Sequence, residues 1–458
     1  MLRVRIQHAR VGMQLAMPVA HPRQAEVILL RQGVTLDAFN IPRLHELGIE
    51  DIWVQYPGLE HLAAFVDPEL QHRYRELVRN VGHVMDRAMV ASTGAVEVDF
   101  NECRRMVVGM IARLSGHPQT AVWASQLACA EAPFVRHAGN VCALSVLMGM
   151  RLDWYMVRER PLLPPNRAKE LSSLGVGALF HDLGMLRLPH ADIARWNNEH
   201  DESCPVWRSH AAIGFEMVKG MLDPAAASVV LHHHQAWDGS GFPHRASLKE
   251  GTRPVRERET HVLARIAAAA DLLDRLCNPA HAPGSDPVRT PQVPVVRALK
   301  TIARGGYAPK LDPIVFRALF SIAPPYPPGS LVRLSDGNHA AVVDWTPQDP
   351  CRPTVEVLDL DNVRPTKKRN KPVRLDLREH KKLHVVEHDA YDVSGDNFYP
   401  TTPEEFDLAG LMHSMTNRAR GDLAAQAGAG HLEEATAAPE PVAAAAGAPA
   451  EAAWPEAA

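Results

Sequence analysis

The stretch LHHHQAWDGSGFP (residues 231–243) places three adjacent histidines directly before a glycine-rich turn. Imidazole nitrogens are good ligands for transition metals, and glycines allow close approach to the backbone. The stretch therefore indicates a way to place metal ions beside a bound phosphate.

A second candidate pair, His181 and Asp182, lies upstream in the stretch GALFHDLG (residues 177–184). Adjacent residues on a helix point about 100° apart, so the histidine can bind one ion while the carboxylate bridges two. The full set of candidate ligands is His137, His181, Asp182, His210, His233, His234 and Asp271. A set of imidazoles and carboxylates without thiolates favours iron, manganese or a nickel-like octahedral site over structural zinc.

The composition is that of a soluble globular protein with two or three domains: 458 residues, 46% hydrophobic and 22% charged. A net charge of −4 argues against a general nucleic-acid binder but is compatible with a small anionic substrate. The six cysteines form no Cys-x-x-Cys pair, which is typical of reduced thiols in a cytoplasmic protein. We expect neither a signal peptide nor a membrane span, because no apolar run reaches about 18–20 residues.

The middle of the chain has the periodicity of helices. Residues 63–115 are expected to form connecting helices, and residues 116–325 an all-α domain with apolar residues at three- and four-residue spacing. His137 is expected early in a helix, His181 and Asp182 at a helix end, and Asp271 inside an alanine-rich helix. His233 and His234 are expected to close another helix before the glycine turn.

The flanking regions have different patterns. Residues 1–62 alternate short apolar runs with turns, which predicts a small strand-rich module. Residues 326–395 are expected to form a small β-module, with a hairpin at Asp336-Gly337. Residues 396–458, especially from Ala424, contain few large apolar side chains, so a largely disordered tail is expected. The predicted fold class is therefore mainly α, with two small flanking modules.

Over roughly residues 116–325 the chain resembles the HD-GYP family, a branch of the HD metal-dependent phosphohydrolases. His181-Asp182 matches the HD pair, and DGSGFP (residues 238–243) matches the family's DGSGYP. The other matching segments are Arg265-Ile266, Ala270-Asp271 and Leu311-Asp312-Pro313. Residues 1–62 are similar to a small module that often precedes this domain.

The resemblance implies an all-α fold and the hydrolysis of cyclic di-GMP to the linear dinucleotide or to GMP. It implies that the seven candidate ligands hold two divalent ions, iron or manganese, with Asp182 as the bridge. A third ion is not expected, because Pro133 occupies the position of the glutamate that supports it. Other proteins of cyclic di-GMP signalling, such as GGDEF-domain proteins, are the expected partners, and neither a nucleic-acid polymer nor a membrane is expected.

The residues of the glycine turn are candidates for contact with the substrate. By the resemblance, Gly239, Ser240 and Gly241 shape the loop around the site. Trp237 can stack on a guanine base, and an equal alternative is that it packs within the loop.

Three departures from the family pattern bear on activity. Met185 replaces the lysine of HDxGK, Gln235 replaces a glutamate, and residues 278–281 replace an Arg-x-Tyr segment. Arg187 is a candidate for the missing catalytic cation, and the alternative is a solvated surface arginine. The sequence thus leaves three hypotheses: a slow cyclic di-GMP phosphodiesterase, a catalytically weak or inactive scaffold protein in cyclic di-GMP signalling, and a hydrolase of another nucleotide.

Overall fold

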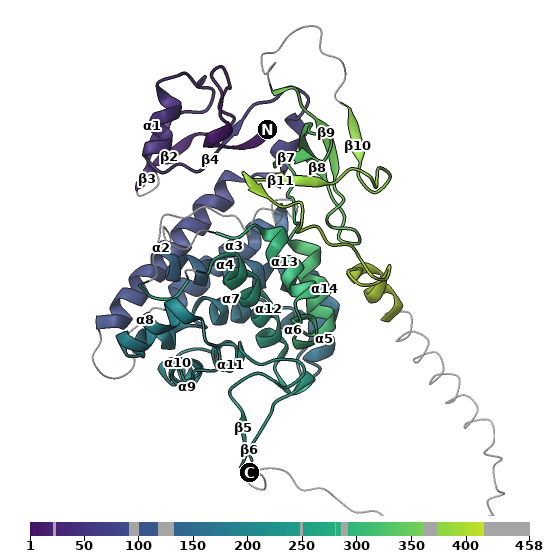
Figure 1. The fold of residues 1–458 in the computed structure, drawn as a ribbon. Coiled ribbons are helices and arrows are strands. Elements are labelled where there is room, and N and C mark those ends of the chain that lie inside the picture. Colours follow the sequence, from purple (N-terminus) through teal and green to yellow (C-terminus); the bar gives the residue numbers. More distant parts are fainter. Residues whose placement is uncertain are drawn as a thin grey trace, which may run out of the picture. The chain divides into compact units, whose positions relative to one another are not determined.

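The computed structural model describes residues 1–21, 24–90, 100–117, 132–247, 251–279, 281–284, 292–360 and 373–415. The chain divides into two compact units, Met1–Leu408 and Ala409–Ala458, and every element described below belongs to the first. This unit contains a helical body and two strand-rich modules (Figure 1). The predicted mainly-α fold class is confirmed.

The centre of the helical body is α4 (Pro133–Arg151), which is buried throughout residues 137–149. It packs against α2 (Pro68–Val90), α7 (Ser172–Leu179) and α12 (Val262–Cys277). Helix α11 (Pro224–His232) packs against α7 and α12, and α10 (His210–Val218) packs against α11. The helices expected around residues 141–150, 171–180 and 262–276 are therefore present and form the core.

The remaining elements of the helical body are shorter or peripheral. They are α3 (Phe100–Gly116), α5 (Asp153–Glu159), α6 (Pro165–Ala168), α8 (His190–Glu199), α9 (Pro205–Arg208), α13 (Val295–Arg304) and α14 (Pro313–Ile322). Three short 3-10 helices, η4 (Leu183–Arg187), η5 (Glu257–Glu259) and η6 (Ala308–Lys310), and a hairpin of β5 (Arg245–Ser247) and β6 (Gly251–Arg253) connect them.

Helices α2 and α3 belong to the helical body, although the sequence predicted that residues 63–115 only connect the modules. The hydroxyl of Tyr74 in α2 donates a hydrogen bond to Asn140 of α4. Val107 of α3 lies against Gly175 of α7, where an added Cβ would come within 2.5 Å of it. The helical body therefore begins before residue 116, because these helices cover apolar faces of α4 and α7.

Local sequence signals explain several helix boundaries. The carboxylate of Asp223 accepts hydrogen bonds from the backbone N–H groups of Ala225 and Ala226 at the start of α11. Asp312 caps α14 in the same way, and in both helices proline follows the capping residue. Gly184 permits a close contact, since a Cβ there would lie 2.0 Å from the carbonyl oxygen of His210. This contact sets η4 directly against the start of α10.

The N-terminal module contains two antiparallel strand pairs. β1 (Leu2–Arg5) pairs with β4 (Asp51–Val54), and β2 (Val19–His21) pairs with β3 (Gln24–Leu30). Helix α1 (Asn40–Glu46) ends just before Gly48, whose φ of 77° suits glycine. The 3-10 helices η1 (Ile6–His8) and η2 (Glu60–Phe65) complete the module. The predicted strand-rich module and its short helix are present.

The C-terminal module is a single sheet with strand order β10-β9-β8-β7-β11-β12. The strands are β7 (Leu331–Leu334), β8 (His339–Asp344), β9 (Thr354–Val357), β10 (Arg374–Asp376), β11 (Val385–His388) and β12 (Tyr391–Asp392). β7 and β8 form the hairpin expected at Asp336-Gly337, and Gly337 has a φ of 89°.

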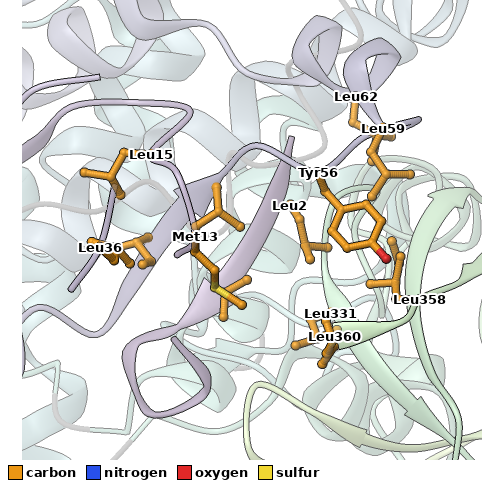
Figure 2. Packing of buried hydrophobic residues seen from close by; sticks show 14 of the residues in the cluster. Leu2, Met13, Leu15, Leu36, Tyr56, Leu59, Leu62, Leu331, Leu358 and Leu360 are labelled. Carbon is orange, nitrogen blue, oxygen red and sulfur yellow. The ribbon is translucent and has the colours of Figure 1, made fainter. Parts of the chain in front are cut away.

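The two strand-rich modules share one hydrophobic core, although the sequence indicated separate modules. Leu2, Tyr56 and Leu59 belong to the same buried cluster as Leu331 and Leu358 (Figure 2). The backbone of Arg3 forms a parallel bridge with Ser330, and its guanidinium forms an ion pair with Asp389. Both ends of the described chain therefore complete one apolar interior.

The predicted tail boundary at residue 396 is wrong for the segment up to residue 408. Phe398 is 3% exposed and Phe406 is fully buried, and both rings contact Phe320 of α14. The sequence signal was weak because these aromatic residues lie in a stretch rich in polar residues and proline, without helix or strand periodicity. Residues 416–458, including those from Ala424, lie outside the described residues. None of the described helices combines the length and the apolar character that a membrane span requires.

Candidate metal centre

The structure brings all seven predicted ligands together in two groups. One group is His137, His181 and Asp271; the other is Asp182, His210, His233 and His234. Within each group, the potential ligand atoms all lie within 4.8 Å of one another. The side chains come from α4, the turn after α7, α10, the end of α11 and α12. Each of the seven side chains is at least nine-tenths buried.

Asp182 lies between the two groups. Its Oδ2 atom is 3.4 Å from Nε2 of His181 and 3.6 Å from Nε2 of His137. Its Oδ1 atom is 3.3 Å from Nε2 of His210 and 3.4 Å from Nε2 of His233. Each carboxylate oxygen therefore faces one group, which is the arrangement of a carboxylate that bridges two ions.

The sequence argument that treated His181 and Asp182 as adjacent residues on a helix is wrong. His181 and Asp182 do not lie on a helix, because α7 ends at Leu179 and Asp182 directly precedes η4. The turn between the two elements separates the side chains, and the close approach of Gly184 to α10 brings Asp182 towards His210.

Three of the histidines are oriented by backbone carbonyl groups. The Nδ1 atoms of His181, His210 and His233 lie 2.7, 2.5 and 2.8 Å from carbonyl oxygens. The acceptors are Ala178, Trp207 and Val230, each three residues before its histidine. Because Nδ1–H donates to the backbone, the lone pair of Nε2 points into the site, as a metal ligand requires.

His137 is oriented by a carboxylate that the sequence analysis did not identify. Its Nδ1 atom lies 2.7 Å from Oδ2 of Asp274. The side-chain amides of Asn140 and Asn278 donate to Oδ1 of Asp274 over 2.7 and 2.9 Å. Asp274 follows Asp271 by three residues on α12, so helical spacing on one face was the available signal.

The buried donor atoms fit divalent metal ions. The Nε2 atoms of His137 and His181 are 3.2 Å apart, as are those of His210 and His233. Two such lone pairs repel each other unless a cation lies between them, and two nitrogens bound to one ion at about 2.1 Å lie roughly 3.0–3.4 Å apart. Both carboxylate oxygens of Asp271 and Nε2 of His234 are buried without a hydrogen-bond partner among the described residues. These atoms are suited to metal coordination.

The carboxylates of the site are ionised. Burial opposes their charge, yet the His181 ring and its neighbours hold the pKa of Asp182 well below its usual value. Burial likewise opposes the charge of Asp271, but the Arg275 guanidinium, followed by His137, keeps its pKa well below the usual value. Both aspartates are therefore in the form that binds metal.

Four of the five ligand histidines fall into two electrostatic classes. Burial lowers the pKa of His233 to about 4 and that of His234 well below its usual value, so both rings are neutral. Burial also opposes a charge on His137 and His181, but the surrounding carboxylates outweigh it. They raise the pKa of His137 well above its usual value and that of His181 to about 9. The group that contains His137 and His181 therefore attracts positive charge strongly.

The glycine-rich loop fixes the orientation of His234. A Cβ on Gly241 would lie 2.3 Å from the carbonyl oxygen of His234, so only glycine fits there. The backbone N–H of Phe242 donates to that carbonyl over 3.1 Å, and its ring stacks on the His234 ring at 4.6 Å. Gly239 has a φ of 83°, and the exposed Ser240 hydroxyl donates to Asp238 within the turn. Contact of these loop residues with a substrate stays a prediction.

The other residues singled out in the sequence have different surroundings. The Arg265 guanidinium lies 5.5 Å from the centroid of the Trp237 ring, which supports the packing alternative for this tryptophan. The side-chain amide of Gln235 donates to the carbonyl of Pro243 and so holds the loop. Met185 is 2% exposed within η4, and Arg187, the last residue of η4, is partly buried.

Arg275 is a cation at the ligand cluster that the sequence analysis did not identify. Its Nε atom lies 3.0 Å from Oδ2 of Asp271, one turn earlier on α12. Its Nη1 atom lies 2.7 Å from Oε1 of Glu202. A positive charge therefore contacts the candidate centre on the side of Asp271.

Comparisons with known proteins agree with this architecture. The family model described as "HD domain" matches residues 134–276. A protein from Pseudomonas aeruginosa, named a cyclic di-GMP phosphodiesterase, is 24% identical over 352 residues, which cover 71% of this chain and 78% of the relative. A cyclic di-GMP phosphodiesterase of Thermotoga maritima is 28% identical over 109 residues (23% of this chain, 27% of the relative). A 3'3'-cGAMP-specific phosphodiesterase of Vibrio cholerae is 26% identical over 100 residues (21% and 17%).

The helical body and its histidine–aspartate centre are those of an HD domain, which spans residues 134–276. The resemblance to the HD-GYP family predicted from the motifs is confirmed by this domain match and by the similarity to cyclic di-GMP phosphodiesterases.

Proposed function

We propose that this protein is a metal-dependent phosphodiesterase that hydrolyses cyclic di-GMP to the linear dinucleotide or to GMP. The observation that carries the proposal is the position of Asp182, whose two oxygens each face one pair of histidine nitrogens. The names of the similar proteins from Pseudomonas and Thermotoga support cyclic di-GMP as the substrate.

The residues of the centre are prepared for this chemistry. Divalent ions held there would supply positive charge for a phosphodiester and lower the pKa of a water molecule towards neutrality. Backbone carbonyls keep the protons of three histidines on Nδ1, and Asp274 keeps that of His137. Burial of the ligands strengthens the electrostatic interactions within the site.

The donor set supports two ions and favours iron or manganese. It consists of imidazole nitrogens and carboxylate oxygens, without a thiolate, and it forms two groups that share Asp182. The seven ligands proposed are those predicted from the sequence. Asp182 is proposed as the bridging residue, and His181 as the ligand beside it.

Turnover is proposed to be slow because Met185 replaces the family's lysine. Met185 is 2% exposed and carries no charge, so it cannot stabilise a phosphate. This substitution, together with Gln235, favours the second candidate function, a catalytically weak or inactive scaffold protein in cyclic di-GMP signalling. GGDEF-domain proteins are the partners that the resemblance implies for either function.

A cytoplasmic location is part of the proposal. The five cysteines of the described residues are free thiols, which agrees with a reducing compartment. The substrate proposed is also an intracellular type of messenger.

The test is metal analysis and product chromatography on protein purified without oxygen. We expect two equivalents of iron or manganese and conversion of cyclic di-GMP to a linear product. Incubation with 3'3'-cGAMP in parallel tests the alternative cyclic dinucleotide. Two bound metals with no product from either substrate would favour the scaffold function, and protein free of metal after reconstitution would contradict the metal centre itself.

A further inference from the structure

Arg275 occupies an unusual position beside the candidate metal centre. Its side chain is only 15% exposed, and its Nε atom is 3.0 Å from Oδ2 of Asp271. The other oxygen of Asp271, Oδ1, faces Nε2 of His137 at 3.3 Å. The Oδ2 atom that Arg275 contacts also lies 3.9 Å from Nδ1 of His234, so the guanidinium adjoins a carboxylate that faces both ligand groups. Glu202, which is 49% exposed, accepts from Nη1 over 2.7 Å on the solvent side.

The contact between Arg275 and Asp271 differs from the arginine contacts that hold this fold together. Arg113 grips Asp67 with two N–H groups, and Arg265 donates to both Glu159 and Asp312. The buried Nε of Arg275 makes no hydrogen bond despite its short distance to Asp271. Among the described residues, the one hydrogen bond of this guanidinium runs from Nη1 to Glu202. Most of the donors of this guanidinium are thus unused.

The centre needs a cation that Met185 does not provide. A phosphodiester gathers negative charge as it is hydrolysed, and a fixed positive group beside it lowers the barrier. Arginine is suited to this role because its planar fork of donors matches the oxygens of a phosphate.

We propose that Arg275 is a catalytic residue that binds a non-bridging oxygen of the scissile phosphodiester and stabilises its developing charge. The inference rests on the proposed function and extends it. Water adds to phosphorus, the bond from phosphorus to the leaving sugar oxygen breaks, and the proton of water passes to that oxygen. Arg275 exchanges no proton in this reaction and acts by its charge and its N–H groups.

The position of Glu202 gives this proposal a distinctive consequence. Its carboxylate competes with a phosphate for the same guanidinium. If Arg275 binds phosphate, removal of the Glu202 charge strengthens that binding. If Arg275 only positions Asp271, loss of its outer partner loosens the pair and gives no gain. The two roles therefore predict opposite effects of Glu202→Gln.

The experiment measures the binding of inorganic phosphate to the full-length, manganese-loaded protein by calorimetry, with metal content measured on each sample. We expect Arg275→Met to retain its metal and to bind phosphate at least tenfold more weakly, and Arg275→Lys to be intermediate. Glu202→Gln should bind phosphate severalfold more tightly. The matched control is Arg195→Met, which removes an arginine that pairs with Glu199 on the surface of α8 and should leave binding unchanged.

The proposal is overturned if Arg275→Met binds phosphate as tightly as the natural protein, or if it loses metal in parallel with phosphate. Arg275→Lys provides the same comparison if the methionine variant does not fold, because it keeps the charge and loses the fork. Hydrolysis of cyclic di-GMP is measured separately. If cyclic di-GMP is not hydrolysed but Arg275→Met still weakens phosphate binding, the proposed function is rejected and Arg275 remains a phosphate-binding residue.

Discussion

The Nδ1 atom of His137 and the Oδ2 atom of Asp274 lie 2.7 Å apart, although 137 positions separate the two residues in the chain. This contact joins α4 to α12 at the point where each helix contributes a candidate ligand, His137 and Asp271. One buried carboxylate thus orients the ring and adds a polar contact between two core helices, and two asparagine amides hold it in place.

We predict that Asp274→Ala weakens metal binding by about 10–100-fold, because His137 loses the acceptor that fixes its tautomer and ring orientation. Competition with a fluorescent chelator measures the affinity, and circular dichroism checks the fold. Asp274→Asn retains the shape of the side chain, so its metal affinity should lie between those of the natural protein and the alanine variant. An alanine variant with natural metal affinity would show that the histidine needs no such support.

Asp182→Ala and His181→Ala are each predicted to lose bound metal and all hydrolysis. Asp182 faces both ligand groups, so its removal affects both positions, whereas His181 belongs to one group. Metal content by mass spectrometry and product chromatography test this expectation. Natural metal content and turnover in either variant would contradict the two-metal assignment.

Met185→Lys is predicted to raise the rate of cyclic di-GMP cleavage tenfold or more. One preorganised donor for developing negative charge typically contributes about 10²–10³ in rate, and metal binding should not change because Met185 is not a ligand. Steady-state kinetics on both proteins provide the measurement. If the lysine adds nothing, another cation already serves, and Arg187→Ala and Arg275→Met identify which arginine it is by the loss of rate.

Asp389→Asn is predicted to destabilise the contact between the two strand-rich modules by roughly 2 kcal/mol at neutral pH, the range for a hydrogen bond to a charged group. Asparagine tolerates the φ of 50° found at this turn, so the variant removes the charge and preserves the backbone. Arg3 would keep its second partner, Asp51. Asp376→Asn, which removes a local pair between the last residue of β10 and Arg378, is the control.

The effect of Asp389→Asn should depend on pH in a defined direction. Burial opposes the charge of Asp389, but Arg3 and its neighbours hold its pKa well below the usual value. The stabilisation is therefore complete above the unfolded-state pKa of about 4 and is lost as pH falls towards the folded-state value. Thermal unfolding at pH 7 and at lower pH should show a gap between the two proteins that shrinks with acid. A constant gap would exclude the carboxylate charge as its cause.

Two truncations should separate the end of the folded chain from its tail. Deletion of residues 424–458 is predicted to leave the melting temperature and metal content unchanged, because that composition has almost no large apolar side chains. Truncation after residue 395 removes Phe398 and Phe406, and Phe406→Ala alone should cost about 3–5 kcal/mol. A large fall in melting temperature after the shorter deletion would show that the tail is docked.

The sequence identified the ligands better than it identified their supports. The histidines and aspartates of the centre stand in motifs with characteristic spacing, so their residue types and order were informative. Asp274 could in principle have been predicted, because it follows Asp271 by three residues on the same helix. Arg275 could not be predicted, because a single arginine on a helix follows no motif. Only the structure shows that the loop with Glu202 lies against it. The turn at His181 and Asp182 depends on a helix end, the least certain feature of a periodic pattern.

Long-range packing was also beyond the sequence pattern. Alternation of apolar residues predicted strands at both ends of the chain, but it does not specify the partner of a strand's buried face. The joint core of Leu2 and Leu331 depends on that pairing. Phe398 and Phe406 follow no helix or strand periodicity, and only their contact with the Phe320 ring of α14, which the structure shows, explains their burial.

The core common to the two strand-rich modules has a consequence for the order in which the protein is made. The first 62 residues leave the ribosome long before Leu331, Leu358 and Leu360 are synthesised, so Leu2, Tyr56 and Leu59 lack part of their cover during that interval. The helical body is synthesised between the two strand-rich modules and can form its own core first. Closure of the β-interior is then a late event in biogenesis, and a nascent chain stalled before Leu331 would present an apolar surface to chaperones.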